Sequence, residues 1–147
     1  FFLMIRRAPR STLDRSSAAS DVYKRHSTND IEKARYHVLE EGRVFRVRKD
    51  GMGFRSNTEF FKQTADQSTN YYERMWDPII MYRRDLAVAW TTYDFHLNGK
   101  FSHCGAESFT LTRSNNRWMV VDWAYTANEP ENCNSPLGKM SKEELVN

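Results

Sequence analysis

Apolar positions recur with helical spacing soon after residue 26. In the stretch TNDIEKARYHVLEEG, residues 28–42, the apolar side chains that fall three or four positions apart are Ile31, Ala34, Val38 and Leu39. Asn29 and Glu32 have the spacing of a capping box, and Gly42 suits a left-handed C-terminal cap. The pattern therefore predicts a first helix over residues 28–42.

A second helix is predicted over SNTEFFKQTADQ, residues 56–67. Ser56 and Glu59 again have the spacing of a capping box. The apolar side chains expected to face inward are Phe60, Phe61 and Ala65. Between the two helices, RVFRVRK is typical of a strand and DGMG of a turn.

From residue 71 onward, strand patterns alternate with turn signals. Strands are expected at YYERMWDPIIMY, LAVAWTTYDFHL, FSHCGAESFTLTR and RWMVVDWAYT. Pro78 cannot donate to a ladder, so it indicates a bulge or an edge strand. Helices followed by a run of antiparallel strands predict the α+β class, with one curved sheet packed under the helices.

The dipeptide Asn98-Gly99 is the strongest hairpin signal in the chain. A two-residue loop there predicts that Leu97 lies opposite Lys100 and Asp94 opposite His103. The same register places four further pairs, which are His96–Phe101, Trp90–Glu107, Val88–Phe109 and Leu86–Leu111. The opposite face would carry Thr91, Tyr93 and Phe95.

Asp94 and His103 are the candidate catalytic residues. A carboxylate beside an imidazole favours the charged imidazole and orients it, which suits general acid–base work. The alternative is a structural pair that closes the end of the hairpin. His103 and Cys104 are neighbours on a strand and point to opposite faces, which argues against a shared metal ion or a Cys–His nucleophile. We therefore expect no metal site and no cofactor.

Residues 1–26 differ in composition from the rest. The opening FFLMIRRAPRSTLDRSSAASDVYKR resembles translated sequencing-adapter sequence; the alternative is a natural disordered basic arm. These 26 residues hold six basic and two acidic side chains, so the net charge changes from +3 to −1 when they are set aside. The remaining charge does not favour nucleic acid or a membrane as a partner.

The two cysteines, Cys104 and Cys133, are too few for a disulfide framework, and we expect free thiols. No apolar run is long enough to span a membrane. We assign residues 27–128 to one domain and residues 129–147 to a polar tail. The localisation is unknown and is taken as cytoplasmic by default, because the natural N-terminus is expected to be missing.

The hairpin YDFHLNGKFSHCG, together with ERMWDP and RWMVVDWAYT, resembles the nuclear transport factor 2-like superfamily over residues 30–133. The similarity is greatest to its SnoaL-like and lumazine-binding-like branches. The resemblance implies a cone-shaped α+β fold, a strongly bent mixed or antiparallel sheet on N-terminal helices, a pocket and frequent homodimers. The family normally begins with a longer first helix, so the resemblance also implies an N-terminally truncated domain.

Three functions follow from these patterns. The first is binding of a small apolar or aromatic organic ligand in the cone pocket, with the expected lining residues Trp76, Trp90, His96, Glu107, Phe109 and Trp123. The second is a cofactor-free lyase or isomerase that uses Asp94 and His103, with Tyr72 or Tyr93 polarising a carbonyl. Glu73 is a further candidate for this pocket. The third is a non-catalytic dimerisation module with Thr91, Tyr93 and Phe95 at the contact.

Overall fold

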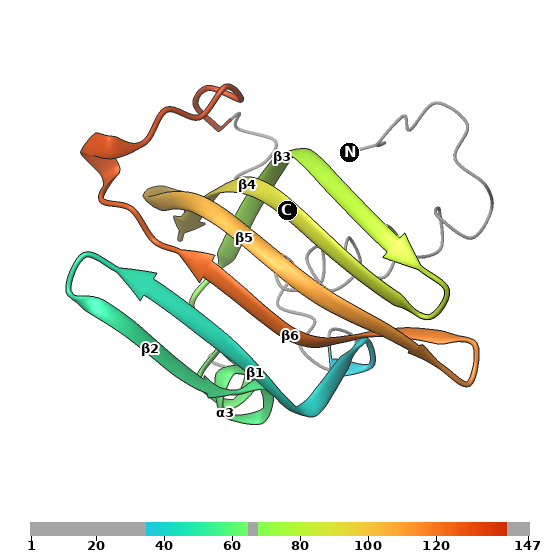
Figure 1. The fold of residues 1–147 in the computed structure, drawn as a ribbon. Coiled ribbons are helices and arrows are strands. Elements are labelled where there is room, and N and C mark those ends of the chain that lie inside the picture. The colour runs from blue at the N-terminus through green and yellow to red at the C-terminus, as the bar shows by residue number, and fades with distance from the viewer. Residues whose placement is uncertain (1–34, 65–67, 141–147) are drawn as a thin grey trace.

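A computed structural model describes residues 35–64 and 68–140 of the chain. Within these ranges, six strands form one mixed sheet in the order β2-β1-β6-β5-β4-β3 (Figure 1). The strands are β1 (Val38–Arg48), β2 (Gly51–Ser56), β3 (Tyr71–Arg83), β4 (Leu86–Leu97), β5 (Lys100–Ser114) and β6 (Arg117–Thr126). β1 and β6 pair in parallel, and every other neighbouring pair is antiparallel.

The meander β3–β6 is held by tight turns, of which the sequence predicts Asn98-Gly99. Asn98 and Gly99 have φ angles of 50° and 74°, and Asn115 and Asn116 have φ angles of 52° and 59°. Positive φ at both central residues matches the twist of a tight hairpin. Asp77 has φ of 52° and the β3–β4 register shifts between Trp76 and Ile79, which confirms the irregularity expected at Pro78. β3 is also an edge strand.

Helix α3 (Asn57–Thr64) defines one face of the sheet, which we call the helix face. The Ser56 amide donates to Glu59 Oε2 at 2.9 Å and the Glu59 amide donates to Ser56 Oγ at 3.2 Å, so the predicted capping box is confirmed. Phe60 and Phe61 turn inward as predicted and contact Trp123 edge-on, with ring centroids 5.1 and 6.2 Å apart. The main apolar core lies between α3 and the sheet.

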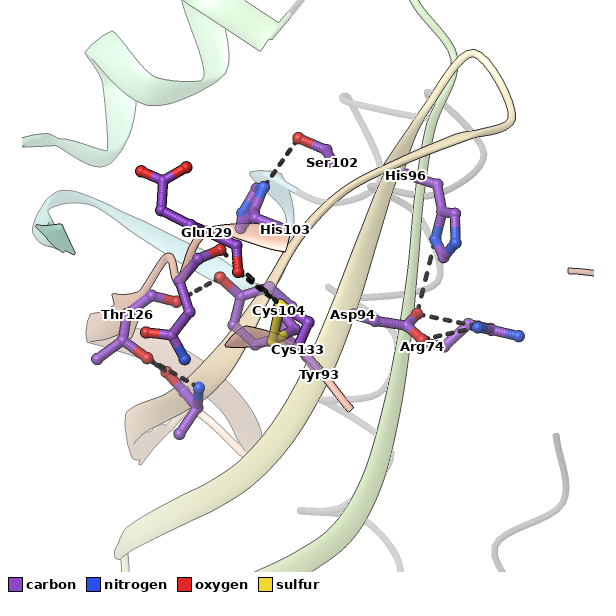
Figure 2. Close-up of a disulfide and its surroundings, with 12 residues drawn as sticks. Arg74, Tyr93, Asp94, His96, Ser102, His103, Cys104, Thr126, Glu129 and Cys133 are labelled. Atoms are coloured by element: carbon purple, nitrogen blue, oxygen red, sulfur yellow. Dashed lines mark hydrogen bonds and ion pairs between the residues drawn. A yellow bond between two sulfur atoms is a disulfide. The ribbon is translucent and has the colours of Figure 1, made fainter. Parts of the chain in front are cut away.

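The other side of the sheet, which we call the tail face, bears Arg74, Asp94 and Cys104. Residues that follow β6 contact it, including the short 3-10 helix η1 (Pro130–Asn132). Cys104 and Cys133 form a disulfide with Cα atoms 5.7 Å apart, so the prediction of free thiols is wrong (Figure 2). The spacing of the two cysteines along the sequence could not reveal the disulfide. Their proximity depends on the pairing of Asn128 with Cys104, which brings the chain back to β5.

The first predicted helix is wrong over its second half. Residues Val38–Gly42 belong to β1, and Val38 pairs with Val120 of β6. Parallel pairing with a strand about 80 residues away overrides the local helical spacing. The expected capping box at Asn29 and Glu32, the adapter-like residues 1–26 and Ala65 lie outside the described residues.

The hairpin register is confirmed at the turn and wrong beyond it. Leu97 pairs with Lys100 and His96 with Phe101, but a bulge then inserts Ser102, so that Phe95 pairs with His103. Every later pair slips by one residue: Asp94 faces Cys104, Trp90 faces Ser108, Val88 faces Thr110, and Leu86 faces Thr112. A one-residue slip moves side chains to the other face, so Asp94 and His103 lie on opposite faces.

Candidate functional site

A cluster of polar side chains lies on the helix face beside the apolar core. We call it the polar cluster; its members are Glu73, Tyr93, His103, Glu107 and Tyr125. Register places them together, because Glu73 and His103 both pair with Phe95, and Glu107 pairs with both Thr91 and Tyr125. The Tyr93 ring lies 5.8 Å from the His103 ring and 6.5 Å from the Tyr125 ring.

Glu107 is the most unusual member of the polar cluster. Its side chain is 8% exposed, and its Oε1 atom has no hydrogen-bond partner among the described residues. Burial, and then the nearby Glu73 carboxyl, raise the pKa of Glu107 well above its usual range. Burial and the charge of Asp94 raise the pKa of Glu73 to about 8. Both groups are therefore held as neutral acids near pH 7, able to donate as well as accept a hydrogen bond.

Tyr93 is held by the end of β6. Its hydroxyl donates to the Thr126 carbonyl oxygen at 2.7 Å. Its cross-strand partner on β5 is Gly105. A Cβ at Gly105 would lie only 1.9 Å from that same Thr126 oxygen. Burial raises the pKa of Tyr93, so its hydroxyl stays protonated.

His103 is neutral on this face. Burial, and then the positive charges of Arg48 and Arg46, lower the pKa of His103 to about 4. Its Nδ1 lies 3.0 Å from Ser102 Oγ (Figure 2), and its ring lies 5.0 Å from Phe95. A neutral imidazole has one nitrogen that can accept a proton, and the lowered pKa makes His103 a weaker base than an exposed histidine.

Apolar rings adjoin the polar cluster. Trp123 contacts Phe109 edge-on, with ring centroids 5.7 Å apart. The Trp123 Nε1 atom is buried and, like Glu107 Oε1, has no hydrogen-bond partner among residues 35–64 and 68–140. Three predicted pocket residues, Glu107, Phe109 and Trp123, therefore share the helix face. The other three, Trp76, Trp90 and His96, lie on the tail face by register.

Asp94 occupies a different environment from the one expected of a catalytic residue. It is fully buried on the tail face, where Arg74 Nε and Nη2 donate to its Oδ1 and Oδ2 at 2.9 and 2.7 Å. The His96 Nδ1 atom lies 3.6 Å from Asp94 Oδ1, and Arg74 also donates to the Gly138 carbonyl at 2.7 Å. Figure 2 shows this group apart from His103 and Tyr93. The predicted Asp94–His103 pair is thus wrong.

Other predictions about individual residues also change. Thr91 and Tyr93 are 3% and 1% exposed, so the expected dimer contact through them is wrong. Glu73 shares the face of His103, whereas Tyr72 pairs with His96 and lies on the tail face. Sequence reasoning missed Tyr125, although its two-residue spacing from Trp123 places both on one strand face.

The described part of the chain has neither a cluster of metal ligands nor a membrane-spanning helix. It contains no group of three or more potential metal ligands. No helix within it has both the length and the apolar character needed to cross a bilayer.

Comparison with known proteins gives matches at the level of structure. No protein-family model and no curated protein matches the sequence. An NTF2-like protein from Cytophaga hutchinsonii superposes with a TM-score of 0.64 at 12% identity, covering 82% of this chain and 99% of that one. An NTF2-like protein with a cystatin-like fold from Novosphingobium aromaticivorans gives 0.64 at 12% identity, covering 87% and 88%. A putative dehydratase of the NTF2-like family from Streptomyces avermitilis gives 0.63 at 13% identity, covering 82% and 98%.

These similarities agree with the mixed sheet and its meander. At such low identity they establish the fold and leave the activity open. The chain therefore has the nuclear transport factor 2-like, cystatin-like fold, with its polar cluster on the helix face of the sheet.

Proposed function

We propose that this chain binds a small organic molecule on the helix face, against the polar cluster and the Trp123 ring. The observation that carries the proposal is the pair of buried polar atoms, Glu107 Oε1 and Trp123 Nε1, that lack partners among the described residues. A buried polar group without a partner costs roughly 1–3 kcal/mol. A ligand that supplies the missing hydrogen bonds recovers that free energy.

The chemistry of these two atoms indicates the kind of ligand. Trp123 Nε1 can only donate, and a protonated Glu107 can donate or accept. The ligand therefore presents an oxygen, such as a carbonyl or hydroxyl, toward this part of the face. The adjoining rings of Phe109 and Trp123 favour a flat, largely apolar body.

A thermal-shift screen with flat aromatic ketones and phenols tests this function, followed by calorimetric titration of the compounds that stabilise the chain. We expect Glu107→Leu and Trp123→Phe each to weaken binding by about tenfold or more, since each removes one hydrogen-bonding group. Trp90→Phe, on the tail face, is the matched control and should bind normally. If no compound stabilises the chain, or if Glu107→Leu binds as well as wild type, the proposal fails.

A second candidate function is acid–base catalysis on the bound molecule, as in dehydration or isomerisation of a carbonyl compound. Two features support it: neutral His103 can take a proton, and protonated Glu107 can give one, from the same face. One structural neighbour bears the name of a putative dehydratase. His103 replaces Asp94 in the role of base.

Deuterium exchange detects this chemistry without knowledge of the product. A bound ketone should exchange its α-protons in D₂O faster with wild type than with His103→Gln, whereas Trp90→Phe should match wild type. Binding without any enzyme-dependent exchange would leave the binding function and remove the catalytic one.

We further propose, from the sequence resemblance, that the chain belongs near the SnoaL-like branch, has its sheet bent into a cone and forms a homodimer. Size-exclusion chromatography with light scattering tests the assembly. A monomer at high protein concentration would remove the homodimer from the proposal.

A further inference from the structure

Two arginines of β1 lie beside the polar cluster, and neither has an acidic partner among the described residues. Arg46 and Arg48 are two positions apart on the strand, so both point to the helix face. None of the ion pairs formed within the described residues involves either of them. By contrast, Arg74 and Arg113 each bind an aspartate.

Register connects these arginines to Glu107. Arg46 pairs with Tyr125 of β6, and Tyr125 pairs with Glu107 of β5, so the three residues form one row across three neighbouring strands. Neighbouring strands are about 4.8 Å apart, so the Arg46 and Glu107 backbones are separated by roughly 10 Å. One end of the row is cationic, and the other is a buried carboxyl with an oxygen that has no hydrogen-bond partner in the part of the chain that the structure describes.

The acids on this face do not neutralise the arginines. Glu73 and Glu107 have raised pKa values, which keep them largely uncharged near neutral pH. The positive charges of Arg46 and Arg48 are felt across the face, since both lower the pKa of His103. The side chain of Arg55 on β2 donates a hydrogen bond to the Gln63 side-chain oxygen.

We infer that the ligand is an organic acid whose carboxylate binds Arg46 and Arg48, while its apolar body extends across Tyr125 toward Glu107 and Trp123. This inference rests on the proposed binding function and adds the chemical class of the ligand. Guanidinium groups match carboxylates in geometry and bind them in a bidentate manner. A span of roughly 10 Å suits a carboxylate attached to one to three fused rings.

The test compares acids with their methyl esters. Calorimetric titration uses 4-hydroxybenzoate, 6-hydroxy-2-naphthoate and 6-hydroxy-2-anthroate, each beside its methyl ester, at low and high salt, so that every compound also carries a hydroxyl for Glu107 and Trp123. We expect the better-fitting acid to bind at least tenfold tighter than its ester at low salt, and the advantage to shrink at high salt because ions screen the charges. An Arg46→Gln, Arg48→Gln double variant should lose the preference for the acid.

The same strand supplies a matched control. Arg43 lies in β1 on the tail face, so Arg43→Gln should keep the full acid preference. Circular dichroism checks that both variants are folded. Equal binding of acids and esters to wild type would overturn this inference and leave the proposed function standing. Binding of none of the six compounds would overturn both, and an acid preference that survives the double variant would overturn the assignment to Arg46 and Arg48.

Discussion

The absence of a side chain at Gly105 allows the end of β6 to approach β5 closely. β6 ends beside Gly105, and a Cβ at residue 105 would lie only 1.9 Å from the Thr126 carbonyl oxygen. The Thr126 hydroxyl also accepts a hydrogen bond from the Ala106 amide at 3.0 Å. The position of Tyr93 in the polar cluster therefore depends on the absence of a side chain at residue 105.

Gly105→Ala should destabilise the fold by about 1–3 kcal/mol, because the added methyl forces the β6 end away from β5. Urea denaturation measures the change. Gly53→Ala is the control, since nothing lies within 4 Å of a Cβ at Gly53. The explanation fails if the two variants lose the same amount.

The β3–β4 hairpin carries a buried ion pair on the tail face. Arg74 and Asp94 are 8% and 0% exposed and are joined by two hydrogen bonds. Removal of one member of a buried pair leaves the other charge without compensation. The pair therefore stabilises the hairpin and the attached tail.

Asp94→Asn should lower the free energy of unfolding by about 3–5 kcal/mol, because the Arg74 guanidinium stays buried. Asp85→Asn breaks the exposed Asp85–Arg113 pair and should cost less than about 1 kcal/mol. Chemical denaturation of both variants measures the difference. Similar losses would contradict the structural role given to Asp94.

The disulfide joins two elements that are separated by the whole of β6. Cys104 lies in β5 and Cys133 directly follows η1, and 29 positions separate them. Closing such a loop restricts the unfolded chain, and the η1 segment has few other contacts with the sheet.

Replacement of Cys104 and Cys133 by serine should lower the free energy of unfolding by about 2–4 kcal/mol. It should also increase hydrogen exchange in residues 128–138. Mass spectrometry of alkylated protein measures the thiol content directly: we expect no reactive thiol before reduction and two after it. Two reactive thiols in untreated protein would contradict the disulfide.

Across the whole molecule, the acids of the polar cluster link stability to pH. A carboxyl whose pKa is raised by folding contributes stability below its unfolded pKa, and loses it as pH rises through the folded value. Glu73 has a folded pKa of about 8. Folding lowers the pKa of His103 to about 4, so its titration changes the free energy of unfolding mainly below its unfolded pKa of 6.5. Above pH 6.5, the pH dependence of the free energy of unfolding therefore reports on Glu73 and Glu107.

The free energy of unfolding should fall between pH 6.5 and 8.5. Glu107→Gln should reduce this slope by up to about 1.4 kcal/mol per pH unit, because the amide has no proton to lose. Denaturant titrations at several pH values measure the slope, with exposed Glu41→Gln as the control. Parallel curves for wild type and Glu107→Gln would contradict a raised pKa.

Local signals in the sequence determined the elements that depend on near neighbours. The Ser56–Glu59 capping box begins α3, Asn98-Gly99 closes the β4–β5 hairpin, and Pro78 marks an irregular edge strand. Each of these works through the residue's own backbone preference or through a partner a few positions away. For this reason the α+β class and the four-strand meander were predictable.

Contacts between distant residues decided the site. The bulge at Ser102 moved His103 away from Asp94, and pairing with β6 turned Val38–Gly42 from a predicted helix into a strand. Only the assembled sheet brings Arg46, Tyr125 and Glu107 into one row, and only the chain's return to β5 joins Cys104 to Cys133. Side chains alternate along a strand, so one extra residue changes the face of every residue beyond it, and spacing along the sequence cannot reveal that change.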